Sequence, residues 1–259
     1  EMITLISPAK SLDYDTHLPL KEFSIPNHLS DSKSLMKSLR FYDPDNLSSL
    51  MGVSEKLAIL NFERNMNWSP PTRLEKNSRQ AIYAFKGDVY MGIDSYSLSK
   101  NQINFLNNHL RILSGLYGIL KPLDLIKPYR LEMGTKINNS KGKNLYEFWG
   151  NKITASVNET LSTHRNKTVV NLASAEYFSS IKLSELESKV VKPVFKDYKK
   201  GKYKIISFFA KRARGLMVRY LAENKIDKPE DLNDFNLGGY KYSKKDSSEL
   251  EPVFLRKQI

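Results

Sequence analysis

The chain has 259 residues, of which 40% are hydrophobic and 27% charged, which is enough to bury a sizeable core. The absence of cysteine excludes disulfide scaffolds, thiol nucleophiles, iron–sulfur clusters and cysteine-ligated zinc. No apolar run approaches the roughly 18–20 residues of a membrane span, and we expect no secretory leader. The composition therefore predicts a cytoplasmic protein without a membrane anchor.

Positive charge is concentrated in the second half of the chain. The formal net charge is +13, to which residues 1–129 contribute only +2 and residues 130–259 contribute +11. The segment from Lys189 to Arg219 carries eleven Lys or Arg residues against a single acid, Asp197. Such concentration favours a polyanion partner, most often nucleic acid, over a generally basic protein with solvated charged faces.

Apolar spacing and capping patterns predict a mixture of helices and strands in the first half. In chain order we expect a strand at Met2–Ile6, helices at Asp31–Tyr42 and Ser54–Trp68, a helix from the capping box Thr72–Glu75 to Ala84, a strand entered through Phe85–Tyr90, and a helix from the capping box Ser99–Gln102 to Leu113.

The second half continues the mixture. We expect a strand at Tyr129–Met133, a long helix at Leu145–His164, a strand at Thr168–Leu172, a helix at Ser174–Ile181, a hairpin of Val190–Tyr198 with Tyr203–Phe209, a helix at Ala210–Asn224, and a closing hairpin of Tyr240–Tyr242 with Val253–Leu255. The order lacks the regular alternation of doubly wound or barrel folds. The elements therefore predict one compact α+β domain over residues 2–259, with short strands and two hairpins.

A helix–hairpin–helix-like element is expected at about residues 99–127. Leu113–Gly118 has the apolar-x-Gly-apolar-x-Gly pattern of the tight turn in that module, which grips duplex DNA without reading its sequence. Backbone N–H groups there could bind phosphate oxygens, with a lysine just beyond adding a cation. The alternative is an ordinary helix–helix turn with a glycine cap. The candidate DNA-binding residues here are Ser114, Gly115, Tyr117, Gly118 and Lys121.

The basic hairpin and helix at about residues 189–224 form a second candidate DNA surface. Four lysines surround the hairpin turn, and the helix places cations off its apolar stripe. These side chains could contact successive phosphates of a nucleic acid. Few aromatic residues lie among them, so a surface that stacks the bases of single-stranded nucleic acid is less favoured. The alternative is that the hairpin tip is merely solvated and the arginines of the helix cover the core. The candidate residues on the helix are Lys211, Arg212, Arg214 and Arg219.

Charged residues also occur inside otherwise apolar segments, where a core would be served by apolar side chains. If they converge on one pocket, they could perform acid–base chemistry or hold an anionic small molecule. The alternative is a set of separate structural ion pairs. The candidate pocket residues are Lys10, Lys86, Asp88, Arg130, Glu132 and Glu176.

No metal or cofactor site is expected. The four histidines lie far apart in the sequence without a helical i, i+4 pair, and no phosphate-binding loop, dinucleotide fingerprint or nucleophile elbow is present. Carboxylate iron sites need Glu and His spacings on helices that the chain lacks. Iron storage is therefore disfavoured.

Several sequence blocks together resemble the YaaA peroxide-stress-response family. The resemblance runs over nearly the whole chain without a departure inside the blocks. They are Ile6–Lys10 (ISPAK), Ala84–Tyr90 (AFKGDVY), His109–Gly118 (HLRILSGLYG), Pro122–Leu125 (PLDL), Pro128–Gly134 (PYRLEMG), Asn171–Ser174 (NLAS), Glu176–Phe178 (EYF), Lys192–Phe195 (KPVF) and Ala210–Met217 (AKRARGLM).

The resemblance implies a bacterial cytoplasmic protein that limits DNA damage and free iron during hydrogen peroxide stress. It implies a mixed fold in which a helix–hairpin–helix-like element, falling on Leu113–Gly118, lies beside a basic groove that binds duplex DNA, including bent or branched forms. The groove would draw on Lys211, Arg212 and Arg214. No catalytic residue and no obligate protein partner are implied.

Two functions follow. The first is sequence-nonspecific binding of double-stranded DNA in the peroxide response. The second is an enzyme that acts on an anionic small molecule or nucleotide in the charged pocket. Convergence of the six candidate pocket residues on one open cavity would favour the second.

Overall fold

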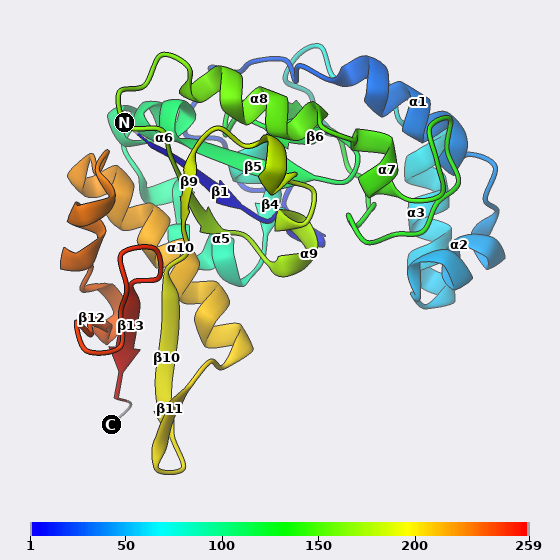
Figure 1. The fold of residues 1–259 in the computed structure, drawn as a ribbon. Helices are drawn as coiled ribbons and strands as arrows, with labels where there is room; N and C mark the ends of the chain where they lie inside the picture. Colours follow the sequence, from blue (N-terminus) through cyan, green and yellow to red (C-terminus); the bar gives the residue numbers. More distant parts are fainter. Residues whose placement is uncertain (1, 258–259) are drawn as a thin grey trace.

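The fold is built around a five-stranded sheet in a computed structural model that describes residues 2–257 (Figure 1). The strand order is β6-β5-β1-β8-β9, and every neighbouring pair is parallel except β5 with β6. The strands are β1 (Met2–Ile6), β5 (Leu110–Ser114), β6 (Gly118–Leu120), β8 (Thr168–Leu172) and β9 (Lys189–Val191).

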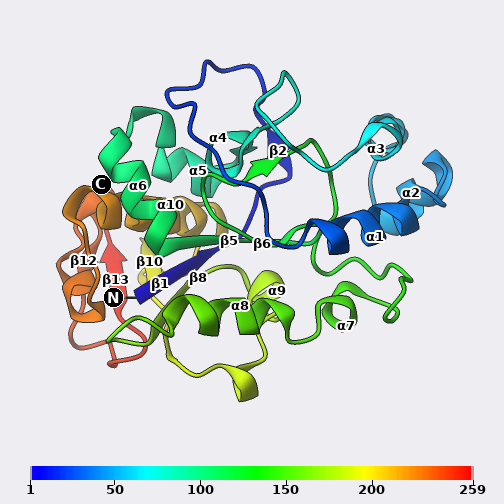
Figure 2. The same ribbon diagram turned by 90° about the horizontal axis from the view of Figure 1, so that it is seen from above.

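The two central strands are buried along their whole length. In β1, Thr4 lies opposite Leu110 of β5 and Val170 of β8. The helices α6 (Lys100–His109) and α8 (Lys152–Leu161) lie on opposite sides of this sheet (Figure 2). Parallel strands covered on both faces need near-continuous apolar sequences, which explains the composition of β1 and β8.

A second sheet of four strands lies beside the first. Its order is β11-β10-β13-β12, and its inner face packs the aromatic rings of Phe195, Phe235, Tyr240 and Phe254 together. The long helix α10 (Ser207–Asn224) contacts both β10 and the short helix α5 (Asp88–Ile93). The strands are β10 (Val194–Lys199), β11 (Lys202–Lys204), β12 (Lys241–Tyr242) and β13 (Val253–Arg256).

The remaining elements are short and surround the two sheets. Two small ladders pair β2 with β4 and β3 with β7. The elements are α1 (Leu29–Leu39), α2 (Pro44–Met51), α3 (Glu55–Asn67), α4 (Ala81–Ala84), α7 (Leu145–Trp149), α9 (Ala175–Phe178), β2 (Ser11–Leu12), β3 (Arg79–Gln80), β4 (Phe85–Lys86), β7 (Leu125–Ile126), and the 3-10 helices η1 (Ser95–Ser97), η2 (Leu183–Glu185), η3 (Pro229–Asp234) and η4 (Leu237–Gly239).

The α+β class is confirmed, and several elements match their predictions. The strands expected at Met2–Ile6 and Thr168–Leu172 coincide with β1 and β8. Hairpins also form near both expected places, as β10–β11 and β12–β13. The first is shorter than expected, because Lys189–Val191 pairs with β8 in the other sheet and residues 207–209 begin α10. Within residues 2–257, no helix combines the length and the apolar composition that crossing a membrane requires.

The expected helix–hairpin–helix-like element is wrong in its second part. The capping box of Ser99 and Gln102 does start a helix, but α6 ends at His109. The chain then enters β5, turns, and returns as β6 in an antiparallel hairpin. Pairing of β5 with β1 buries Leu110, Ile112 and Leu113 of this segment, and that burial outweighs the local helical pattern.

Two other helices also differ from their predictions. The capping-box pattern at Thr72–Glu75 starts no helix, because Glu75 forms a β-bridge with Ser78 and the first helical residue is Ala81. The long helix expected at Leu145–His164 breaks into α7 and α8 at Gly150, which has a φ of +52°. A positive φ ends a helix and favours glycine.

Candidate functional site

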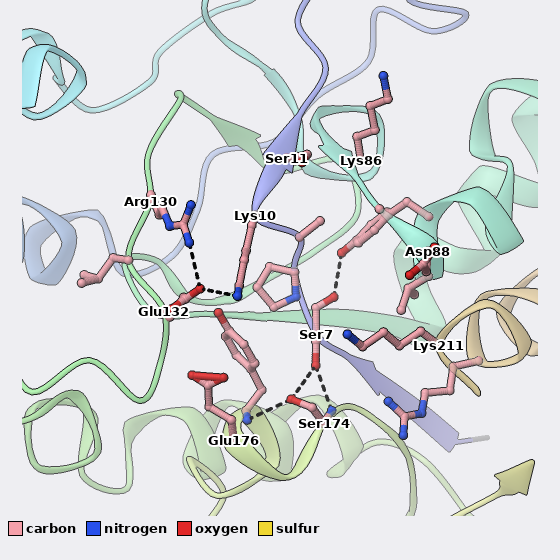
Figure 3. A pocket seen from close by; sticks show the side chains of 18 of the residues that line it. Ser7, Lys10, Ser11, Lys86, Asp88, Arg130, Glu132, Ser174, Glu176 and Lys211 are labelled. Carbon is pink, nitrogen blue, oxygen red and sulfur yellow. Dashed lines mark hydrogen bonds and ion pairs between the residues drawn. The ribbon is translucent and has the colours of Figure 1, made fainter. Parts of the chain in front are cut away.

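A pocket of about 400 Å³ lies at the carboxyl ends of β1 and β8 (Figure 3). Ser7 follows β1 and Ser174 follows β8, and because the two strands are parallel, these serines meet. The Ser174 N–H donates to Ser7 Oγ at 2.9 Å, and Ser7 Oγ donates to Ser174 Oγ at 3.3 Å. The carboxyl edge of a parallel sheet is where ligands bind in open α/β folds.

All six candidate pocket residues line this one cavity. They come from four separate segments of the chain, and they are Lys10, Lys86, Asp88, Arg130, Glu132 and Glu176. Their convergence answers the question that the sequence left open, because separate structural ion pairs would have scattered them over the molecule. The pocket therefore has the convergent charges expected of a binding or active site.

Three of these residues form a cluster around one carboxylate oxygen. Lys10 Nζ lies 3.0 Å from Glu132 Oε1, and Arg130 Nη2 lies 3.5 Å from the same oxygen. The Lys10 side chain is 68% exposed, so it reaches the cavity from its open side, whereas those of Arg130 and Glu132 are largely buried. Among residues 2–257, the buried Nε of Arg130 has no hydrogen-bond partner.

The other three residues differ in how firmly they are held. Glu176 Oε2 accepts a hydrogen bond of 2.9 Å from the backbone N–H of Gly134. Lys86 and Asp88 are exposed at the rim, and Lys86 extends away from the centre of the pocket in Figure 3. Of the charged groups of these three residues, only the Glu176 carboxylate is therefore held by a backbone hydrogen bond within residues 2–257.

Two cations of α10 complete the lining, which joins the pocket to the basic segment. Lys211 points toward Ser7 in Figure 3, and Arg214 lines the pocket beside it. Burial lowers the pKa of the Arg214 guanidinium. Within residues 2–257, neither side chain forms an ion pair or a side-chain hydrogen bond, so both remain available to an anion.

Tyrosine rings form much of the apolar wall. The Tyr90 hydroxyl donates to the carbonyl oxygen of Ser7 at 2.9 Å, and the Tyr129 hydroxyl lies 2.6 Å from Ser114 Oγ. Burial raises the pKa values of Tyr90, Tyr129 and Tyr177, so these phenols stay neutral. With two hydroxyls already bonded, the rings offer mainly apolar surface.

The segment expected to contact DNA through backbone amides is buried instead. Ser114, Gly115, Tyr117 and Gly118 are all buried in the β5–β6 hairpin, and Lys121 is half-buried behind it. A Cβ on Gly115 would clash with the carbonyl oxygen of Leu131, so the backbone here faces protein. This removes the hairpin from the candidate DNA surface.

The expected cations of α10 divide into three groups. Arg212 is exposed, whereas Lys211 and Arg214 line the pocket. Arg219 is partly buried, and its Nη1 donates to the carbonyl oxygen of Ile93 at 3.0 Å. The surface of α10 open to a large polyanion is therefore its first half.

The β10–β11 hairpin, residues 194–204, is called here the basic arm because it projects from the body of the molecule (Figure 1). Its tip carries Lys199, Lys200 and Lys202, all exposed, and Lys204 follows on β11. Tyr198 and Tyr203 pair across the arm with ring centroids 5.2 Å apart, and both rings are exposed. The arm thus presents aromatic surface as well as charge.

Sequence reasoning missed Ser7, Ser174 and the tyrosines of the pocket. A usable signal was present, because Ser7 directly follows one strand that the sequence predicts and Ser174 lies two residues after another. Their meeting depends on the parallel pairing of β1 with β8, which no local pattern reveals. Among residues 2–257, no cluster of three or more His, Asp or Glu residues is placed to hold a metal ion.

Comparison with known proteins gives a consistent result. The sequence profile of a family described as "Peroxide stress protein YaaA" matches residues 2–246. A UPF0246 protein of Neisseria gonorrhoeae (strain NCCP11945) is 52% identical over 257 residues, covering 99% of each chain. UPF0246 proteins of Teredinibacter turnerae and Aliivibrio fischeri (strain ES114) are 50% and 51% identical, covering 99% of this chain and 100% and 99% of their own.

Proposed function

This chain belongs to the family of the peroxide stress protein YaaA, and we propose that it binds double-stranded DNA without reading sequence. The basic arm and the exposed first half of α10 would hold the phosphate backbone, including that of bent or branched DNA. In the cytoplasm of a peroxide-stressed cell this binding would shield DNA. Lower free iron would accompany that role indirectly.

The observation that carries this proposal is the unopposed positive charge of the basic arm. The only acid between Lys189 and Arg219 is Asp197, which is buried. Its carboxylate accepts hydrogen bonds from Arg256 Nε at 2.5 Å and from the Tyr240 hydroxyl at 2.7 Å. The arm therefore exposes only positive charges, which favours a polyanion over a protein partner of mixed charge.

Phosphate contact of this kind predicts strong salt dependence and little sequence preference. Each phosphate that a cation neutralises contributes about −0.9 to the slope of log K against log salt concentration. The experiment is a fluorescence anisotropy titration of a labelled duplex and a four-way junction at several salt concentrations. Wild type is compared with the arm variant, in which Lys199, Lys200, Lys202 and Lys204 are changed to Gln.

A matched control removes the same charge elsewhere. The control variant changes four exposed lysines outside the basic arm and α10 to Gln: Lys33 and Lys37 of α1, Lys56 of α3, and Lys76 in the turn between Glu75 and Ser78. We expect the arm variant to lose affinity and to flatten the salt slope by about 0.9 for each contact removed. Equal losses in both variants, or no binding by wild type at low salt, would show that the proposal is wrong.

A second candidate function is supported by the convergence of six charged side chains in one pocket. Such a site favours an enzyme that acts on an anionic small molecule. Incubation with a panel of nucleoside phosphates, followed by chromatography, tests this. Turnover that is lost in Glu132→Gln would support an enzyme, whereas turnover equal in wild type and variant would point to a contaminant and remove this candidate.

A further inference from the structure

The pocket and the proposed DNA surface share the first half of α10. Arg212 is exposed on the outer side of the helix, while its neighbours Lys211 and Arg214 line the cavity. A polyanion lying on α10 would therefore run past the mouth of the pocket. A duplex cannot enter a cavity of about 400 Å³, but a single nucleotide is a ligand of suitable size.

We propose that this pocket binds one nucleotide unit, with its phosphate at Lys211 and Arg214 and its base at Lys10 and Glu132. The unit is either a free nucleoside monophosphate or a nucleotide extruded from a bound duplex. The extruded form rests on the DNA binding proposed above, whereas the free form does not.

The phosphate end is argued from unmatched positive charge. Five cations line the cavity against three acids. The carboxylate of Glu132 is already bonded to Lys10 and Arg130, and that of Glu176 to the N–H of Gly134. Within residues 2–257 no acid pairs with Lys211 or Arg214, so an anion from outside would supply the missing partner.

The base end is argued from the paired donors and acceptor opposite α10. Lys10 and Arg130 both bond to Oε1 of Glu132, and within residues 2–257 Oε2 forms no hydrogen bond. An ammonium donor therefore lies beside a free carboxylate acceptor. The Watson–Crick edge of a base presents this kind of mixed donor and acceptor pattern.

The wall between these two ends is apolar and partly aromatic. The rings of Tyr90 and Tyr129 and the side chains of Val89 and Leu131 line it. A flat base can pack on such a surface, as bases stack on aromatic rings in proteins that bind unpaired nucleotides. Inorganic phosphate alone would leave this wall and the Lys10–Glu132 pair unused.

The test has two experiments that distinguish the two sources of the nucleotide. In the first, isothermal titration calorimetry measures binding of the four free 5′-nucleoside monophosphates. In the second, a duplex with 2-aminopurine at a mismatch reports extrusion by a rise in fluorescence, while anisotropy of an end label reports duplex binding in the same sample. The proteins are wild type, Arg214→Gln, Glu132→Gln and the control Arg73→Gln, whose side chain is 77% exposed and does not line the pocket.

For wild type we expect a binding signal in at least one of the two experiments. Arg214→Gln should weaken it about tenfold through the lost charge, and Arg73→Gln should leave it unchanged. Glu132→Gln should alter the preference among bases, which general misfolding would not do. Circular dichroism confirms that each variant is folded, and Arg214→Lys should restore part of the signal.

The outcomes separate this inference from the proposed function. Duplex binding without a nucleotide signal in either experiment would overturn the pocket inference and leave the DNA-binding proposal intact. Binding of free nucleotide without any duplex binding would overturn the DNA proposal and support the pocket. Signals equal in wild type, Arg214→Gln and Glu132→Gln would place the nucleotide elsewhere and overturn the inference.

Discussion

Arg219 lies on the basic helix but acts as an internal brace between α10 and the end of α5. Its Nη1 donates to the carbonyl oxygens of Ile93 at 3.0 Å and Asp94 at 3.1 Å, and to Ser97 Oγ at 2.9 Å. Its Nε lies 2.6 Å from Glu223 Oε1. We expect the change Arg219→Ala to lower the free energy of unfolding by about 2 kcal/mol, because several charge-assisted hydrogen bonds are lost.

Urea denaturation measures that loss, and duplex affinity provides the contrast. The folded Arg219→Ala protein should bind duplex DNA within about twofold of wild type, since the guanidinium is already bonded to Ile93, Ser97 and Glu223. Arg212→Ala, on the exposed side of the same helix, should show the opposite pattern of intact stability and weaker binding. Reversed patterns for the two arginines would refute this assignment.

Asp13 predicts a specific acid sensitivity. Burial raises the pKa of its carboxyl, but hydrogen bonds donated by Thr16, Asp15 and Tyr96 outweigh burial and hold the pKa at about 2, below the ordinary 3.8. A folded-state pKa below the unfolded value contributes stability above about pH 4 that is lost as the pH falls through about 2.

The change Asp13→Asn should remove this contribution. Thermal melts of wild type and variant between pH 7 and pH 2 should show a difference in Tm that is largest above pH 4 and closes toward pH 2. A difference that stays constant over this range would mean that the carboxylate charge of Asp13 makes no contribution.

At the scale of elements, the β5–β6 hairpin is a packed part of the core. A Cβ at Gly115 would meet the Leu131 carbonyl oxygen, which is backbone and cannot move aside cheaply. We therefore expect Gly115→Ala to cost about 3 kcal/mol of stability or to prevent folding. Gly52, at the end of α2, has open space around it. Gly52→Ala should cost only about 1 kcal/mol, from its positive φ.

Thermal unfolding followed by circular dichroism compares the two glycine variants. A Gly115→Ala protein as stable as Gly52→Ala would mean that β5 and the loop carrying Leu131 are not packed as described. Because of this packing, substitution of Gly115 or Gly118 would disturb folding and could not be used to test DNA contact. The lysines of the basic arm are therefore the informative positions for DNA affinity.

Elements whose burial follows a local pattern were predictable from the sequence, whereas those fixed by distant pairing were not. Local sequence predicts the buried strands β1 and β8 from their apolar runs, and the start of α3 from its Ser54 cap. In contrast, β5 follows directly on a helix and becomes a strand only because it pairs with β1, far away in the sequence. Local sequence patterns do not reveal the stabilisation that β5 gains from pairing with β1.

The site divides in the same way. Charged residues within apolar segments stand out in the sequence, so all six candidate pocket residues were identified without knowledge of the fold. Ser7 and Ser174 are ordinary residues until the parallel register of β1 and β8 brings them together. The sequence places Arg214 on the DNA surface, because it predicts the helix but not the cavity beside that helix.

At the scale of the whole molecule, the proposed DNA binding has two parts, attraction by the overall charge and retention by local contacts. The net charge of +13 produces a field that attracts any polyanion, wherever the individual lysines lie. Direct phosphate contacts, in contrast, are confined in our proposal to the basic arm and the first half of α10. Steering acts on the association rate, and contacts act mainly on the dissociation rate.

The two lysine variants therefore should differ in kinetics even though they remove equal charge. In stopped-flow measurements with a labelled duplex, both should lower the association rate constant, by factors that shrink as salt rises. Only the arm variant, with Lys199, Lys200, Lys202 and Lys204 changed to Gln, should raise the dissociation rate constant, by about tenfold or more if two or more of the four lysines contact phosphate. An unchanged dissociation rate in the arm variant would mean that the arm attracts DNA without holding it, and the phosphate contacts would then have to lie on α10.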